Sequence, residues 1–446
     1  MKTVIVHNGV KYRPAYQLLS PKIFHQNRNK QSSINTKFFL SPQAALALRS
    51  DETYLNLSDR QIGCISKEIN TLTNLEELEL QNNRLKSIPN ISGLQSLVFC
   101  DLGGNELTSL EGIERLKFLQ KLHVYHNRLP SLPEEITALT NLGALQVNNN
   151  ALKSLPKKIG KLSSLYYLNF AHNHLPSLPE EIQTLDNLER LRLEHNELNS
   201  LPKGIGGLSS LYYLNLGGNH LRSLPKEIGN LGSLENLRVR NNALTSLPEE
   251  IGNLGSLEVF DASGNELKAL PEQIGNLKSL EELNISKNQL PSIPNKSIGN
   301  LARLQKFYAQ KNQLRFLPTD IGECKRLNRL NVAFNELPSI PKEIGRIHSL
   351  KSFDCNDNRC KGIPEEICLL PNLKEAYFGG EKLTDISRIL EMKHLRELSL
   401  SNSRLPYIPD EKIGAFRELE KLFLKNVGLQ RIPKGLVSLR TRLKSF

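Results

Sequence analysis

The stretch LYYLNFAHNHLPSLPEEIQTLDN, from Leu165 to Asn187, carries leucine or isoleucine at fixed places and asparagine at its ninth position. The same order of residues recurs along nearly the whole chain as L-x-x-L-x-L-x-x-N-x-L-x-x-L-P-x-x-I-G-x-L-x-x. The ninth-position asparagine occurs thirteen times, mostly in steps of 23 residues, at Asn83, Asn105, Asn127, Asn150, Asn173, Asn196, Asn219, Asn242, Asn265, Asn288, Asn312, Asn335 and Asn358. Such strict register indicates a structural repeat.

Each copy of this repeat predicts one coil of a stacked array. The alternation in L-x-L is typical of a strand with one buried face, and a single coil cannot bury its apolar side alone. Stacked strands lie about 4.8 Å apart and form one parallel sheet. The return leg LPxxIGxL favours extended or short helical turns and is bulkier than the strand, so the sheet should line the concave side of a curve. The asparagine should point inward and pair with backbone groups of adjacent coils.

We expect seventeen coils between Leu55 and Leu429, with three regions along the chain. Residues 1–50 form a basic segment with a short capping helix over 41–49, and residues 51–429 form the array. Residues 430–446 form a closing segment. The asparagine ladder is interrupted only in the first and the last three coils, at Arg60, Glu381, Ser403 and Val427. Apolar residues mark one side of the closing segment: Leu436, Leu439, Leu443 and Phe446.

The return legs LPKEIGNLGSL (Leu224 to Leu234) and LPEEIGNLGSL (Leu247 to Leu257) carry a resemblance to known proteins. They resemble those of the Ras-group intracellular leucine-rich repeat proteins and of the leucine-rich repeat effectors of bacteria that live in or on eukaryotic hosts. The likeness covers about residues 53–440. It implies an α/β-type leucine-rich repeat solenoid, with short helical, 3-10 or extended segments on its convex face. It also implies a protein-binding scaffold with no cofactor and no chemistry of its own.

The sequence lacks the common signatures of enzymatic chemistry. GxxxxGK[ST], HExxH and GxSxG are all absent. Cys100 and Cys355 occupy strand leucine positions, so we expect them to be buried rather than reactive. His126, His172 and His195 each precede a ladder asparagine, and the last two should lie about 5 Å apart. Because only Glu194 could add a further ligand, a polar binding edge is favoured over a metal site.

The charge of the chain lies mainly at its ends. The net charge is +12, yet residues 1–50 hold eight Lys or Arg and residues 430–446 hold five, neither with any acid, so residues 51–429 carry about −1. A near-neutral array offers no cationic track for nucleic acid. Docking of the basic ends on anionic lipid stays open. Scattered cysteines and the lack of an apolar run or secretory signal favour a reducing, cytoplasmic location.

The stretch SSLYYLN occurs twice, beginning at Ser163 and Ser209. In stacked coils Tyr167 and Tyr213 stand in one concave column with Arg190 between them. Tyrosine and arginine are enriched at binding hot spots. We expect the partner-binding residues to be Tyr125, His126, Tyr167, His172, Arg190, Arg192, His195, Tyr213, Arg238 and Arg240. The alternative is a duplication that copied the tyrosines without a function, and a second aromatic group comprises Tyr308, Phe334, Tyr377 and Phe423.

These features favour a non-enzymatic scaffold that binds another protein, with an acidic or phenol-accepting surface, on its concave face. No small-molecule substrate is expected. The resemblance favours a bacterial effector that reaches the host cytosol without a Sec signal. A cytosolic Ras-group-like signalling scaffold is one alternative. Binding of nucleic acid or anionic membrane through the basic termini is another.

Overall fold

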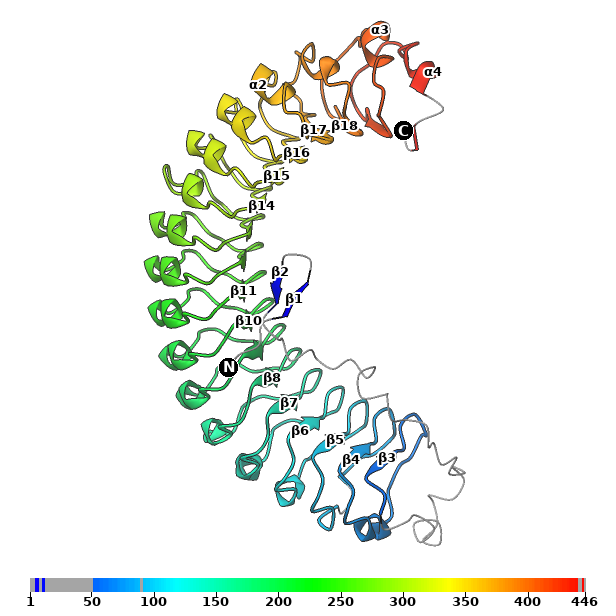
Figure 1. Cartoon of the computed structure of the whole chain (residues 1–446), viewed down its shortest axis with the longest axis vertical. Coiled ribbons are helices and arrows are strands. Elements are labelled where there is room, and N and C mark those ends of the chain that lie inside the picture. Colours follow the sequence, from blue (N-terminus) through cyan, green and yellow to red (C-terminus); the bar gives the residue numbers. More distant parts are fainter. Residues whose placement is uncertain (1–4, 8–9, 13–50, 89–90, 440–442, 445–446) are drawn as a thin grey trace.

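The computed structural model describes residues 5–7, 10–12, 51–88, 91–439 and 443–444. Within them, seventeen three-residue strands pair in parallel and in chain order, and they form the concave layer of an arc (Figure 1). These strands are β3 (Tyr54–Asn56), β4 (Glu77–Glu79), β5 (Phe99–Asp101), β6 (Lys121–His123), β7 (Ala144–Gln146), β8 (Tyr167–Asn169), β9 (Arg190–Arg192), β10 (Tyr213–Asn215), β11 (Asn236–Arg238), β12 (Val259–Asp261), β13 (Glu282–Asn284), β14 (Lys306–Tyr308), β15 (Arg329–Asn331), β16 (Ser352–Asp354), β17 (Glu375–Tyr377), β18 (Glu397–Ser399) and β19 (Lys421–Phe423).

The sheet is open, and its edge strands β3 and β19 lie near opposite ends of the arc (Figure 1). Its register follows the repeat, because residues at equivalent positions of neighbouring coils are paired. Leu168 pairs with Leu191, and Leu191 pairs with Leu214. The predicted repeat solenoid with seventeen coils is therefore confirmed. Two further strands, β1 (Ile5–His7) and β2 (Val10–Tyr12), pair with each other in antiparallel fashion.

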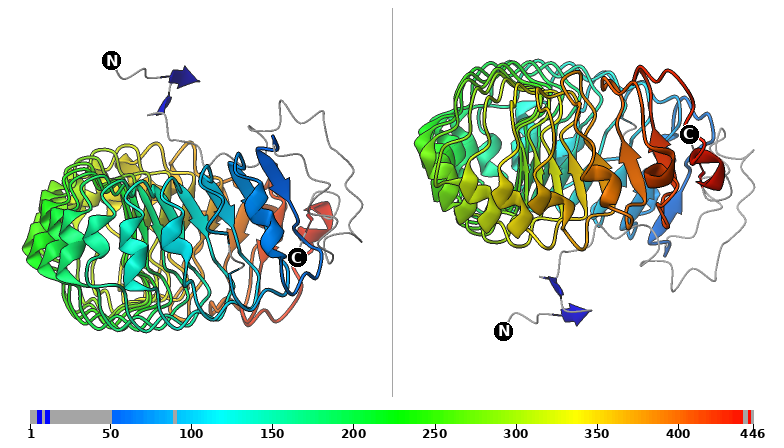
Figure 2. Two further views of the ribbon diagram at one scale, coloured as in Figure 1. Left: turned by 90° about the horizontal axis from the view of Figure 1, so that it is seen from below. Right: turned by 90° about the horizontal axis from the view of Figure 1, so that it is seen from above.

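The return legs form the convex layer, which Figure 2 shows from below and above. Most are single 3-10 turns that begin after the proline of the repeat. The 3-10 helices are η3 (Lys67–Thr71), η4 (Ile113–Arg115), η5 (Glu134–Ala138), η6 (Ile159–Lys161), η7 (Glu180–Thr184), η8 (Lys203–Gly207), η9 (Lys226–Asn230), η10 (Glu249–Asn253), η11 (Glu272–Asn276), η12 (Ile298–Asn300), η13 (Thr319–Glu323), η14 (Lys342–Arg346) and η15 (Ile389–Glu391). The α-helices are α2 (Glu365–Cys368), α3 (Asp410–Ile413) and α4 (Leu436–Leu439).

The glycine after the return-leg isoleucine allows close stacking of these turns. A Cβ on Gly229 would lie 2.4 Å from the carbonyl oxygen of Glu250 in the next coil. No larger residue fits there without pushing the coils apart. Glycine is therefore needed at Gly229, where neighbouring return legs approach closely, although Gln183 and Thr137 stand at the equivalent place of other coils.

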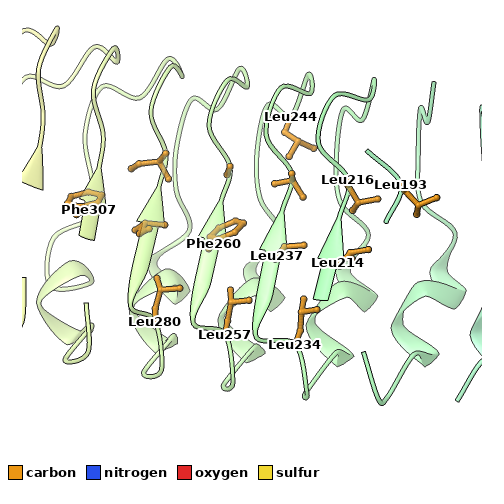
Figure 3. Packing of buried hydrophobic residues seen from close by; sticks show 14 of the residues in the cluster. Leu193, Leu214, Leu216, Leu234, Leu237, Leu244, Leu257, Phe260, Leu280 and Phe307 are labelled. Atoms are coloured by element: carbon orange, nitrogen blue, oxygen red, sulfur yellow. The ribbon is translucent and has the colours of Figure 1, made fainter. Parts of the chain in front are cut away.

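The core is a set of apolar columns that run through the whole array. Leu214, Leu237 and Phe260 lie in one such column and are fully buried (Figure 3). Parallel columns of leucine or isoleucine come from the return leg and from the turn after each strand. Because every coil adds one layer to each column, burial of one coil depends on both of its neighbours.

The asparagine ladder joins the backbones of consecutive coils, as expected. Asn219 is 5% exposed, and its Nδ2 donates hydrogen bonds to the carbonyl oxygens of Leu193 and Leu216, at 3.0 and 2.9 Å. Its Oδ1 accepts a hydrogen bond from the N–H of Leu198 at 3.1 Å. Two of these three groups belong to the preceding coil. The side chain thus satisfies buried backbone groups at the turn where strand pairing stops.

The residue before each ladder position has a positive φ, which the sequence interpretation did not foresee. In sixteen coils this residue has a left-handed φ, and in the remaining coil Gly380 has φ of 159°. Asparagine, glycine and histidine are frequent here because they tolerate this backbone better than most residues. The sixteen are Asp59, Asn82, Gly104, His126, Asn149, His172, His195, Gly218, Asn241, Gly264, Lys287, Lys311, Phe334, Asp357, Asn402 and Asn426.

The two ends of the chain are described only in part. The capping helix predicted over 41–49 lies outside the described residues, as does Phe446. In the closing segment, Leu436 and Leu439 of α4 are buried, and Leu443 packs against the core. The division into 1–50, 51–429 and 430–446 stays a prediction.

The ladder predicts a large stability cost for losing one amide. In Asn219→Ala, two carbonyls and one N–H lose a buried partner, and each unpaired group costs about 1–3 kcal/mol. We expect the denaturation midpoint to fall markedly and amide exchange at Leu198 to accelerate. The control is Asn187→Ala, because Asn187 is exposed and donates one hydrogen bond, to Ser163. Equal midpoints for the two variants would contradict a stabilising role of the ladder.

The left-handed column predicts a stabilising substitution. Lys287 is exposed and has φ of 55°. A left-handed backbone costs an ordinary residue roughly 1 kcal/mol, and asparagine tolerates it better. We therefore expect Lys287→Asn to raise the thermal midpoint, whereas Lys268→Asn, at an exposed site without positive φ, should not. A lower midpoint for Lys287→Asn would show that the lysine makes a compensating interaction.

Candidate partner-binding site

The residues predicted to form one concave column are neighbours in the sheet. Tyr167 of β8 pairs with Arg190 of β9, and Arg190 pairs with Tyr213 of β10. These strands line the inner side of the arc (Figure 1). The predicted stacking therefore places residues from equivalent positions of neighbouring repeats side by side.

Arg190 lies among three tyrosine rings. Its guanidinium carbon is 5.9 Å from the ring centre of Tyr167, 5.9 Å from that of Tyr212 and 5.2 Å from that of Tyr213. Burial raises the pKa of Tyr212, and the charge of Arg190 opposes this effect. Among the described residues, Arg190 has no ion-pair partner, and its buried Nε has no hydrogen-bond partner. The rings thus hold a cation whose charge no carboxylate neutralises.

The accessibility of the two tyrosines differs. Tyr167 is only 7% exposed, although it lies outside the apolar core cluster, whereas Tyr213 is half-buried. Neighbouring side chains on the concave face cover Tyr167, which the alternation of strand residues alone did not reveal. Tyr213 is therefore partly accessible from the concave side, while Tyr167 mainly packs against Arg190.

Arg192 is engaged within the chain. Its Nε donates to Oε1 of Glu194 at 2.9 Å, and its Nη2 contacts the same oxygen. Burial lowers the pKa of Arg192, but the hydrogen bond and charge of Glu194 outweigh this and raise it. Glu194 is 5% exposed, and its Oε2 is buried without a partner among the described residues. Arg192 therefore offers less free charge than its position in the sequence suggested.

Arg238 and Arg240 extend the cationic area along β11. Nε of Arg238 donates to Oδ1 of Asn236 at 3.1 Å, which orients the guanidinium on the concave face. The Arg240 side chain crosses Gly217, where a Cβ would lie 3.0 Å from its Cγ. Neither arginine forms an ion pair in the part of the chain that the structure describes. With Arg190 of β9 they make three unneutralised cations, two of them on β11 or in the turn that follows it.

The histidines occupy the left-handed turn rather than the strands. The rings of His172 and His195 are stacked with centres 4.4 Å apart, close to the expected spacing. Burial and the neighbouring His195 lower the pKa of His172. His126 has the same backbone conformation, with φ of 50°. The described residues contain no group of three potential metal ligands, and the backbone alone explains why histidine recurs at this place.

Tyr125 lies at the N-terminal side of the candidate area. Burial and the nearby Asp101 raise its pKa to about 12. Its ring contacts His126 and His123 edge-on or tilted, with centres 5.9 and 6.2 Å away. Tyr125 and His126 thus form an aromatic group separated from the arginines by the coils of β7 and β8.

A second set of asparagine and aspartate side chains stabilises the concave turns, and the sequence interpretation missed it. Oδ1 of Asn169 accepts the N–H of Ala171, and Oδ1 of Asn215 accepts the N–H of Gly217, both at 3.1 Å. The sequence signal for these bonds was Asn or Asp at the third position of the strand. In most coils a small residue follows two positions later. The acceptors are Asn56, Asp101, Asn169, Asn215, Asp261, Asn284, Asn331 and Asp354.

The second aromatic group does not form one cluster. Tyr377 and Phe423 line a hollow of about 690 Å³ at the C-terminal end of the concave face, whereas Tyr308 and Phe334 lie outside it. Phe334 is exposed, with Nζ of Lys311 5.4 Å from its ring centre.

The cysteines fit the interior positions predicted for them. Cys100, Cys355 and Cys360 are buried, and burial raises the pKa of the Cys360 thiol to about 12. Such thiols are poor nucleophiles. No helix among the described residues is long and apolar enough to cross a membrane.

Comparison with known proteins points to one family. A leucine-rich repeat region matches residues 153–243 and 237–339. The structure of a leucine-rich repeat protein from Leptospira interrogans is similar, with 32% identity and a TM-score of 0.70 over 80% of this chain and 98% of that one. A plant peptide hormone receptor in complex with RGF2 has 30% identity and a TM-score of 0.67, over 85% of this chain and 67% of the receptor chain.

Curated relatives share only part of their length with this chain. A volume-regulated anion channel subunit of Rattus norvegicus is 36% identical over 102 residues, which is 22% of this chain and 12% of the subunit. A protein phosphatase 1 regulatory inhibitor subunit homolog of Arabidopsis thaliana is 39% identical over 83 residues, which is 18% of this chain and 25% of the homolog. The repeat, the solenoid and the near-complete overlap with the Leptospira structure show that the chain belongs to the leucine-rich repeat proteins.

Proposed function

We propose that the protein binds a partner protein through the concave surface of β6 to β11 and performs no chemistry on it. The leucine-rich repeat fold serves in general as a scaffold for protein interactions. The observation that carries the proposal is the set of arginines without ion pairs, Arg190, Arg238 and Arg240, beside Tyr213. Their charge favours an acidic surface on the partner.

The geometry of Arg190 suits tight recognition. An arginine that is already held by aromatic rings loses little conformational entropy when it binds a carboxylate. Unpaired cations on a concave wall also attract an acidic partner before contact. Tyr213 adds a large rigid ring next to them. The surface therefore offers both charge for steering and area for contact.

Similar proteins support a polypeptide as the ligand. The plant receptor of related structure was solved in complex with RGF2 and is described as a peptide hormone receptor. The described residues contain no group of three side chains that could hold a metal ion. We infer that this chain likewise binds a polypeptide on its repeat array.

We further infer that the protein is a bacterial effector that acts in the cytosol of a host cell. The similarity to a Leptospira interrogans protein supports a bacterial context, and the free cysteines fit a reducing compartment. A signalling scaffold in the protein's own cytosol is the second candidate. A translocation reporter fused to the full chain distinguishes them, because only an effector delivers the reporter into host cells.

Binding through the basic C-terminal end is less well supported. Arg431 forms an ion pair with Asp410 at 2.9 Å, and Lys444 forms one with Glu420 at 2.6 Å. These contacts neutralise part of the charge predicted to attract phosphates or lipid. Sedimentation with anionic vesicles, comparing the full chain with Arg431→Ala and Lys444→Ala, tests this alternative.

The concave arginines and tyrosines predict a binding-deficient variant. Replacement of Tyr167, Arg190, Tyr213 and Arg238 together by alanine should abolish partner binding and leave the circular dichroism spectrum unchanged. The partner is identified by capture from host-cell lysate and then titrated in purified form. Its affinity for the wild type should fall with rising salt, because surface charges are screened.

A matched control variant carries alanine at exposed sites away from the strands, at Lys153, Lys203, Arg222 and Tyr407. It should bind as the wild type does. Unchanged affinity of the concave variant for the purified partner would overturn the placement of the site. Wild-type affinity that does not change with salt would overturn the acidic character of the partner.

A further inference from the structure

The hollow at the C-terminal end of the concave face lies between two aromatic rings. Tyr377, Ser399 and Phe423 are the third residues of β17, β18 and β19 and are paired in register. Strands two places apart are separated by about 9.6 Å, so a side chain fits between the rings. Ser399 is small and 4% exposed, and it leaves this space as a hollow of about 690 Å³.

The same chain contains this arrangement in a filled form. At the first positions of β8, β9 and β10, the guanidinium of Arg190 lies between Tyr167 and Tyr213, at 5.9 and 5.2 Å from their ring centres. Both triplets thus place aromatic rings on alternate strands. In the C-terminal triplet the middle position holds serine, and no side chain of the described residues fills the slot.

We propose that this hollow receives an arginine side chain from a partner polypeptide. A planar guanidinium stacks on aromatic faces and is attracted by them. Its five N–H groups also require acceptors around its edge. A binding site for arginine therefore needs aromatic faces and hydrogen-bond acceptors, and the lining of the hollow contains both.

Oxygen acceptors line the slot. Oδ1 of Asn356 is buried and has no hydrogen-bond partner among the described residues. Asp357 contributes a carboxylate, of which Oδ1 accepts a hydrogen bond from Asn402 at 3.0 Å. The hydroxyl of Tyr377 donates to Oε2 of Glu397 at 2.6 Å, so its oxygen can also accept a hydrogen bond. A buried acceptor without a partner is costly, and a guanidinium N–H would satisfy it.

The charge around the hollow favours a cation. The lining itself holds one charge of each sign, Asp357 and Lys425. On the strands around it, acids outnumber lysines, with Asp354, Glu375 and Glu397 against Lys421. Of the four acids, only Glu397 has an ion pair within the described range, with Lys421. Burial raises the pKa of Asp354 to about 6, as expected for a carboxylate without a nearby cation. This region is thus opposite in sign to the arginines of β9 to β11.

The rim of the hollow is held in place before any ligand binds. Nδ2 of Asn426 donates to Oδ1 of Asn402 at 3.2 Å, and Nδ2 of Asn402 donates to Asp357. Gly379 and Gly380 carry no side chain, which lets Asn402 reach Asp357 across the coil between them. A free amino acid would bring its own carboxylate close to Asp357 and Glu375. An arginine side chain within a polypeptide avoids this repulsion.

The experiment uses N-acetyl-arginine methylamide as the probe, with the full chain observed by amide NMR. We expect saturable shifts at Asn356, Ser399 and Ser401. The citrulline analogue keeps the planar shape without the charge, and the norleucine analogue keeps only an alkyl chain. Both should bind at least tenfold more weakly. Equal binding of either analogue, or no saturable shifts with the arginine probe, would overturn the proposal.

Two variants locate the binding in the slot. Phe423→Ala removes one ring wall and should weaken probe binding about tenfold. Ser399→Arg supplies an internal guanidinium and should abolish it. The control is Phe334→Ala, which removes an exposed ring outside the hollow and should have no effect. Probe binding that survives Phe423→Ala unchanged would contradict the proposed slot, even where Ser399→Arg fails to fold.

Discussion

The structure depends on the asparagine amide that, in thirteen of the seventeen coils, joins a coil to the one before it. The side chain of Asn219 satisfies two carbonyls and one N–H, and two of these partners lie in the preceding coil. Without it, the turns after the strands of these thirteen coils would bury unpaired backbone groups. Because the bonds have one geometry, they also set one register. Residues at equivalent positions of consecutive repeats therefore become neighbours. Every column of side chains on the surface results from this register.

The register explains why so much could be predicted from the sequence. Leucine positions, strand pairing, the concave sheet and the adjacency of Tyr167, Arg190 and Tyr213 all follow from stacking of equal letters. Backbone conformation was less visible. His172 and His195 were interpreted as a polar edge, yet a left-handed φ is a sufficient reason for histidine there. A column of asparagine, glycine and histidine was the available signal.

Side-chain choices on the concave face could not be predicted from the repeat. The position of a residue in the repeat determines its column. It does not determine the rotamer of the side chain or the group that it contacts. Arg192 turns to Glu194 on its own coil, and Tyr167 is covered by its neighbours. The hollow at Ser399 is equally invisible, because it arises from a small residue between two large ones on adjacent strands. Such features require the packed surface, not the pattern.

The concave face carries two regions of opposite character on one continuous sheet. The cationic region centres on β10 and the acceptor-lined hollow on β18, eight strands apart, or about 38 Å along the sheet. Every coil between them is bonded to both neighbours, so the separation is set by the stack rather than by a hinge. Residues on a concave surface also converge toward a common interior. A single polypeptide that spans the arc would therefore have to present acidic groups at one end and an arginine at the other, and reversing its direction would bring like charges together. The order of coils along the chain thereby gives the binding face a direction.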